Sequence, residues 1–135
     1  MISGIDVFYV IKDSGTMIAS HKNNGISKID DDLITPMLNG VDIFSNEVFA
    51  SKISYIALVD GRKIYFKNFN VGGQRLTFVA ITNVDFKVEN FKKLDGDMIK
   101  VKWELDKYKD STLSNAVSSE TVERIGKSIG RIFES

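Results

Sequence analysis

The chain has 135 residues, 18 basic and 18 acidic side chains, and no cysteine. This balance argues against a protein that follows a nucleic-acid backbone, because such proteins carry a basic excess. The lack of cysteine excludes disulfides, thiolate catalysis and cysteine zinc sites. There is no signal-peptide pattern and no apolar run of the ~20 residues that cross a bilayer. We therefore expect one cytoplasmic domain over residues 1–135.

The first two strands are predicted over residues 5–11 and 16–20, joined by a turn at 13–15. Gly15 provides a residue for which a positive φ is expected. Residues 5–11 are apolar at both parities, which is typical of a strand covered on both faces, and 76–81 share this pattern. We expect these two strands at the centre of a sheet and 16–20 at an edge.

A helix is predicted over residues 30–49. Its apolar side chains recur at steps of three and four, at Ile34, Leu38, Val41, Phe44 or Ser45, and Val48. Two starts are open. Either Asp31 or Asp32 caps the helix and Pro36 lies in the first turn, or Thr35 is the cap and Pro36 takes the first helical position.

Three strands follow the helix. Residues 54–59 run into Asp60 and Gly61, a strong two-residue hairpin signal, and 62–69 return from it. The glycine-containing turn at 70–74 then leads into the last strand, so this part predicts a three-stranded meander.

Residues 86–108 fit two patterns. Steps of three and four residues, which are typical of a helix, separate Phe91, Leu94, Met98, Val101, Leu105 and Tyr108. A strand-like alternation joins Ile99, Val101, Trp103 and Leu105, so residues 97–108 are helix or strand. The helical pattern covers more residues and includes good helix formers, so we favour a helix with a weak point at Gly96.

A last helix is predicted after a loop at 110–117. Ser118 or Ser119 caps it, and one stripe carries Val122, Ile125, Ile129, Ile132 and Phe133. The spacing of Gly126 and Gly130 is explained by close packing on the sheet, with a partner helix as the second possibility. The lysines before this helix indicate a solvated face, or at most peripheral contact with an anionic membrane.

The pattern predicts a core of residues from the central strands and from each helical layer. We expect the following side chains to be buried: Phe8, Val10, Phe78, Val79, Ile81, Leu38, Val41, Ile129 and Ile132.

No catalytic residue, cofactor-binding residue or metal ligand can be proposed. The aspartates at 30–32 lack the ligand spacing of a calcium loop, and helix capping explains them. His21 is the sole histidine, has no nucleophile signature beside it, and is expected in solvent at the end of an edge strand. A phosphate-binding GxxxxGK[ST] loop is absent. We therefore expect a non-enzymatic protein without a cofactor.

The order strand-strand-helix-strand-strand-strand-helix-helix resembles the longin domain, a relative of the roadblock and profilin-like folds. The likeness rests on the opening hairpin at 4–20, the helix start at Asp31-Asp32-Leu33-Ile34, and the meander at 55–82. It implies an α/β fold, more narrowly α+β, with a five-stranded antiparallel sheet in the order 2-1-5-4-3. One helix would cover one face of this sheet, and the two C-terminal helices would cover the other.

The resemblance also implies a function. Longin-like and roadblock-like proteins often pair, as homodimers or as heterodimers with a related module, and the pairs serve as platforms for Ras-like small GTPases or trafficking-type assemblies. A free-standing interaction module is therefore expected. A PAS-like small-molecule sensor is the alternative, and an enzyme with sites invisible in the sequence is the weakest hypothesis.

A pairing surface can be suggested from the predicted edge strand at 51–59. An edge strand with little charge and no proline exposes amides and carbonyls that another strand can pair with. The interface is expected to involve Phe44, Val48, Phe49, Ile53 and Tyr55. The rival expectation is that Phe49 and Tyr55 pack under the final helices of the same chain.

Overall fold

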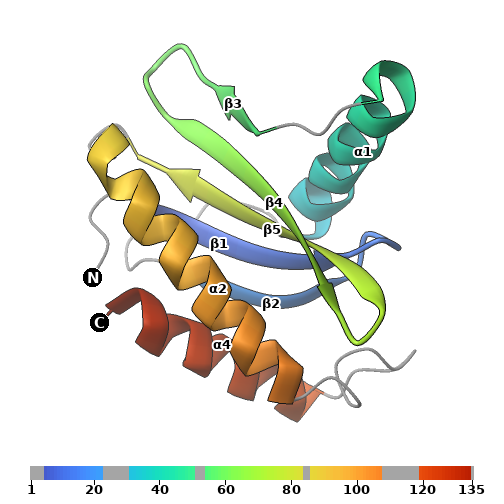
Figure 1. The fold of residues 1–135 in the computed structure, drawn as a ribbon, viewed down its shortest axis with the longest axis vertical. Helices are drawn as coiled ribbons and strands as arrows, with labels where there is room; N and C mark the ends of the chain where they lie inside the picture. The colour runs from blue at the N-terminus through green and yellow to red at the C-terminus, as the bar shows by residue number, and fades with distance from the viewer. Residues whose placement is uncertain (1–4, 23–30, 51–53, 84–85, 108–118, 135) are drawn as a thin grey trace.

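The computed structural model describes residues 5–22, 31–50, 54–83, 86–107 and 119–134 (Figure 1). Its elements follow the predicted order: β1 (Ile5–Lys12), β2 (Met17–Lys22), α1 (Asp31–Phe49), β3 (Tyr55–Ala57), β4 (Lys63–Val71), β5 (Gln74–Thr82), the 3₁₀ turn η1 (Val88–Asn90), α2 (Phe91–Lys107) and α4 (Ser119–Glu134).

The five strands form one antiparallel sheet in the order β2-β1-β5-β4-β3. Helix α1 covers one face, and α2 and α4 cover the other (Figure 1). The α+β fold and its strand order are confirmed. None of the described helices is both long and apolar enough to cross a lipid bilayer.

Glycines at positive φ close the hairpins. Gly15 and Gly61 have φ of +88° and +99°, and each donates its amide hydrogen to the carbonyl three residues earlier, at 2.9 and 3.1 Å. The two-residue turn expected at Asp60 and Gly61 is therefore wrong by one residue, because Val59 also belongs to the loop. The β4–β5 hairpin does close in two residues, 72–73, with φ of +58° and +81°.

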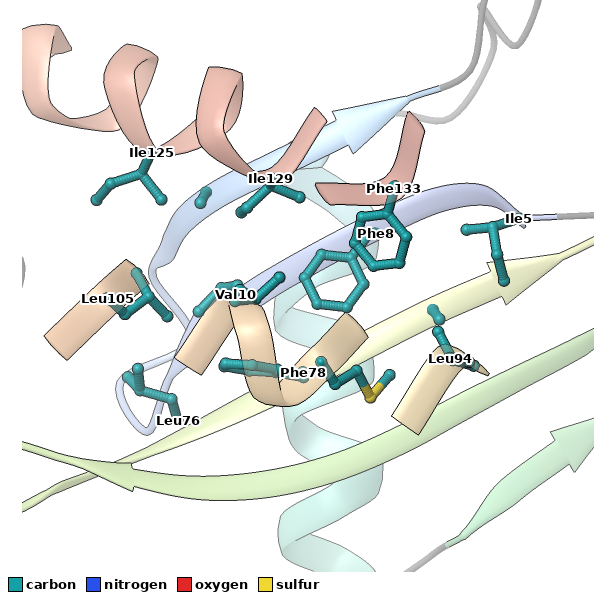
Figure 2. Packing of buried hydrophobic residues seen from close by; sticks show 14 of the residues in the cluster. Ile5, Phe8, Val10, Leu76, Phe78, Leu94, Leu105, Ile125, Ile129 and Phe133 are labelled. Atoms are coloured by element: carbon teal, nitrogen blue, oxygen red, sulfur yellow. The ribbon is translucent and has the colours of Figure 1, made fainter. Parts of the chain in front are cut away.

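The larger core lies between the sheet and the two C-terminal helices. Figure 2 shows the rings of Phe8, Phe78 and Phe133 in this layer, with Phe8 centred 5.7 Å from Phe78 and 4.8 Å from Phe133. Most of the predicted core is buried: Phe8, Val10, Phe78, Val79, Ile81, Leu38 and Ile129. Val41 and Ile132 are only half-buried, because each lies at the margin of its helix face.

Helix α1 differs from its predicted pattern in two ways. It begins at Asp31, so Pro36 lies beyond the first turn, and both the first-turn position of Pro36 and the later start at Thr35 are wrong. Of the two alternatives Phe44 and Ser45, the buried residue is Ser45. Val48, which the apolar pattern places on the buried face, is exposed. The buried face of α1 carries polar side chains, and a pattern of apolar residues does not reveal a face of this kind.

Residues of α2 settle the choice between helix and strand. Val101 and Leu105 are buried, whereas Ile99 and Trp103 are exposed. A strand would place all four on one face, so their division confirms the helix.

Two expectations about the edge strands need correction. His21 lies at the end of the edge strand β2, as expected, but it is not solvated, because its ring stacks on Phe133 with centroids 6.2 Å apart. It is half-buried because α4 covers this strand. Strand β3 has three residues, fewer than the predicted 51–59, and positions 51–53 lie outside the described residues.

Candidate interaction surface

Large apolar side chains are exposed on α1 and on the β3–β4 hairpin. We name this surface the α1–β3 face; it comprises Met37, Phe44, Val48 and Phe49 of α1, Leu58 of the hairpin and the edge residue Tyr55, whose side chain lies on the α2 side of the sheet beside Tyr65. The C-terminal end of α1 and β3 lie at the same end of the molecule (Figure 1). Exposed large apolar side chains on a folded protein make these elements a candidate interaction site.

The α1 part of the surface is a stripe along the helix. Met37, Phe44 and Val48 are spaced by seven and four residues, which places them on one side of the helix. Phe44 is 57% exposed and its ring lies edge-on to that of Phe49, with centroids 6.0 Å apart. The stripe therefore presents aromatic surface to solvent.

The β3 part of the surface is a sheet edge. β3 pairs only with β4, from Tyr55 opposite Tyr65 to Ala57 opposite Lys63. No other strand among the described residues pairs with its outer side. Tyr55 is 50% exposed, and its ring centroid lies 5.6 Å from that of Tyr65, where burial raises the pKa of the Tyr65 phenol.

The inner face of α1 is held by a polar contact. The Asp42 carboxylate accepts a hydrogen bond from the Arg75 guanidinium of β5 at 2.8 Å, and its side chain is only 2% exposed. The Thr77 hydroxyl donates to the same Asp42 oxygen at 3.5 Å. The second Asp42 oxygen and the Arg75 Nε atom are buried and have no hydrogen-bond partner within the described part of the chain.

Several contacts hold one side of α1 against the sheet. Leu38, Asp42 and Ser45 lie on this side, and all three are buried. The Asp42–Arg75 pair and the packing of Leu38 belong to it, and the stripe of Met37, Phe44 and Val48 is turned away from the sheet.

Five residues were suggested from the sequence for this interface, and the structure describes four of them. Phe44, Val48, Phe49 and Tyr55 are all exposed on the α1–β3 face, and Ile53 lies outside the described residues. Phe49, at 67% exposure, does not pack under the C-terminal helices. The expectation of internal packing is therefore wrong for Phe49. Tyr55 lies on the α2 side of the sheet, where its ring contacts Tyr65, which in turn packs on Phe91 of α2.

Sequence reasoning missed Met37, Leu58 and the Asp42–Arg75 pair. Met37 lies seven residues before Phe44, so extending the helical steps backwards could have found it. Nothing in the sequence links Asp42 to Arg75, because the two residues are 33 positions apart and only the packing of α1 on β5 brings them together.

A surface groove of about 680 Å³ lies between β2 and α4. Its lining includes Gly126 and Gly130, where an added Cβ would lie 3.4 Å from the Ser20 carbonyl oxygen and 3.2 Å from the His21 Nδ1 atom. The close approach at Gly130 favours the packing explanation there, whereas the space at Gly126 would accept a methyl group at ordinary contact distance. Among the described residues, no group of three or more His, Asp or Glu side chains could hold a metal ion.

Comparison with known proteins finds likeness in structure only. No protein-family model matches the chain. No curated protein matches it in sequence either.

Solved structures do match. Myxococcus xanthus MglB has a TM-score of 0.55 and 16% identity, covering 79% of this chain and 85% of that one. The gliding protein mglB of Thermus thermophilus has a TM-score of 0.52 and 11% identity, covering 98% and 81%. A chain of the mammalian SRP receptor covers 98% and 97% at 14% identity and a TM-score of 0.49. The strand order and the MglB matches together show that this chain has a longin-like fold.

Proposed function

We propose that this protein is a non-enzymatic interaction module that pairs through the α1–β3 face and, as a pair, forms a platform for a Ras-like small GTPase. The observation that carries the proposal is the exposed apolar surface on α1 and β3. The partner class follows from the functions of longin-like and roadblock-like proteins, which this fold resembles.

A second copy of the chain is the proposed occupant of the α1–β3 face. Phe44, Phe49 and Tyr55 are aromatic, and aromatic side chains are enriched in the buried centres of protein interfaces. A two-fold axis beside β3 would bring two α1 stripes together, so that the same patch covers itself. A heterodimer with a related longin-like module would use the same patch.

The pairing geometry depends more on α1 than on strand addition. β3 has only three paired residues, so an antiparallel β3–β3 contact would contribute few backbone hydrogen bonds. The α1 stripe extends from Met37 to Val48 and offers the larger apolar area. We therefore place the two α1 helices side by side, with the β3 edges next to them.

The functional test is binding to purified Ras-like GTPases of the source organism. Each GTPase is loaded with GDP or with a non-hydrolysable GTP analogue and titrated calorimetrically with wild-type protein, Phe44→Lys or Lys127→Ala. We expect wild type and Lys127→Ala to bind one nucleotide state preferentially, and Phe44→Lys to bind more weakly because pairing is lost. If no GTPase binds in either state, the platform function is wrong.

A small-molecule sensor has less support. The space between the sheet and α2 and α4 is filled by core side chains, including Phe8, Phe78 and Met98 (Figure 2). The cavity of about 240 Å³ beside Tyr65 and Phe91 lies at the margin of this layer, where an ion pair joins Lys67 to Asp95 at 3.1 Å. A small molecule that copurifies with the protein would favour the sensor over the platform.

A further inference from the structure

One glycine lies midway along α1 on its solvent side. Gly40 is exposed, its φ is not positive, and no atom of the described residues lies within 4 Å of the position that a Cβ would take. Glycine is among the least favourable residues inside a helix. Neither the backbone conformation nor packing within the described part of the chain therefore accounts for a glycine here.

The surface around Gly40 is apolar. At about 100° per residue, Leu38 and Asp42 each lie about 160° around the helix from Gly40, so this glycine is opposite the buried side of α1. The side chains one helical turn before and after it are all exposed: Pro36, Met37, Ile43 and Phe44. The missing side chain leaves an open position in the middle of an apolar surface, which we call the Gly40 gap.

Gly96 of α2 is a second helical glycine with open space, but its surroundings differ. A Cβ at Gly96 would also meet no atom within 4 Å. Three of the four side chains one turn away are lysines, at positions 92, 93 and 100, and two of these are paired with the Asp97 carboxylate at 3.2 and 3.8 Å. Gly96 therefore interrupts a charged surface, whereas Gly40 interrupts an apolar one.

We propose that the Gly40 gap receives the Phe44 ring of a second copy of this chain, so that two antiparallel α1 helices approach most closely at this point. The inference rests on the proposed pairing through the α1–β3 face and identifies the central contact of that pair. In a two-fold interface each contact occurs twice. Gly40 and Phe44 lie one turn apart, so an axis passing between them places each Phe44 ring over the Gly40 of the other copy.

This arrangement covers the whole apolar stripe of α1. The midpoint of Gly40 and Phe44 is close to the midpoint of the stripe from Met37 to Val48, so the two ends of the stripe meet each other in the antiparallel pair. Glu47 is the one exposed ionisable residue among the described side chains of α1. The two Glu47 positions would be separated by about 15 Å along the helices, which exceeds the screening length of about 8 Å, so their repulsion is small.

The self-complementary shape of α1 argues for a second copy as the occupant. The same helix carries both the large ring and the gap, at the spacing that a two-fold pair needs. A partner of another sequence would have to supply its own ring and its own gap at this spacing. Among the described elements, α1 is the only helix on its side of the sheet, so no described part of the same chain fills the gap (Figure 1).

Exchanging the two sides of the contact tests this inference. Sedimentation equilibrium of the full chain gives the dissociation constants of wild type, Gly40→Leu, Phe44→Ala and an equimolar mixture of the two variants. Gly40→Leu sets a leucine against each Phe44 ring, and Phe44→Ala leaves each gap empty, so each variant alone should pair at least about tenfold more weakly. In the mixed pair, the introduced leucine faces the introduced alanine and the other contact is native. The mixture should therefore pair at least about tenfold more tightly than either variant alone.

A single methyl group separates helix stability from pairing. In the unpaired Phe44→Lys chain, Gly40→Ala should raise the urea midpoint of unfolding, because alanine favours the helix and the space is open. In the otherwise wild-type chain, Gly40→Ala should weaken pairing by about fivefold or more, because the methyl group lies where the helices approach. Gly96→Ala is the matched control, and it should raise the urea midpoint without changing the dissociation constant.

The outcomes distinguish this inference from the proposed function. If wild type pairs and Gly40→Leu pairs equally well, or if the mixture pairs no more tightly than the separate variants, the Gly40–Phe44 contact is wrong and pairing through the α1–β3 face still stands. A monomeric wild type would overturn both. Thermal unfolding followed by circular dichroism verifies that each variant is folded.

Discussion

At the scale of single residues, Asp42 has the largest effect on how α1 is presented. It is a buried carboxylate on a helix whose outer side is apolar, and its 2.8 Å contact with Arg75 is the strongest polar contact described between α1 and the sheet. A carboxylate in this position stabilises the fold only while its partner remains.

Removal of this carboxylate should be costly. Asp42→Ala leaves Arg75 without its charged partner, and we expect the free energy of unfolding in urea to fall by about 1–3 kcal/mol. Asp95→Ala is the control, because its ion pair with Lys67 is largely exposed and should contribute under about 1 kcal/mol. Equal losses in the two variants would contradict the role given to Asp42.

Glycine substitutions test the packing of α4. Gly96→Ala places a methyl group where no atom lies within 4 Å, so helix propensity should raise the free energy of unfolding by up to about 1 kcal/mol. Gly130→Ala gains the same propensity but places its methyl 3.2 Å from the His21 ring, which stacks on Phe133. We expect no gain at Gly130, and a stabilisation equal to that of Gly96→Ala would show that α4 is not tightly packed there.

At the scale of elements, the confirmed predictions are those that depend on residues close together in the sequence. β1 and β5 were recognisable because strands covered on both faces are apolar at both parities, and the glycine turns because few other residues adopt positive φ. The inward face of α1 was not recognisable, since its buried Asp42 depends on Arg75, a distant residue. For the same reason, one feature of the sequence indicated that Phe44 and Val48 lie on the surface: this region has more apolar side chains than one buried helix face needs.

The assignment of α2 as a helix can be tested with two substitutions. Val101→Ala should lower the free energy of unfolding by about 1.5–3 kcal/mol, because Val101 is fully buried. Ile99→Ala should change it by less than about 1 kcal/mol, because Ile99 is partly exposed on the opposite side. Chemical denaturation measures both free energies. Large and equal losses in the two variants would indicate a strand instead of a helix, because a strand places residues 99 and 101 on the same face.

At the scale of the whole molecule, the sheet separates two surfaces of different chemistry. The α1–β3 face is apolar and suits a protein partner, while the outer surface of α2 and α4 carries ion-paired charges and the exposed Trp103. The first of these surfaces bears the central claim, since a platform made of two modules requires that they pair.

Sedimentation equilibrium at micromolar concentration tests that claim most directly. Wild type should sediment with twice the 15.1 kDa mass of the chain, and Tyr55→Lys and Phe44→Lys as monomers, because a lysine in the buried centre of the pair is not solvated. Trp103→Lys, a matched change of an exposed aromatic residue on α2, should remain paired. A wild type that sediments as a pure monomer would contradict pairing through the α1–β3 face, and with it the proposed GTPase platform.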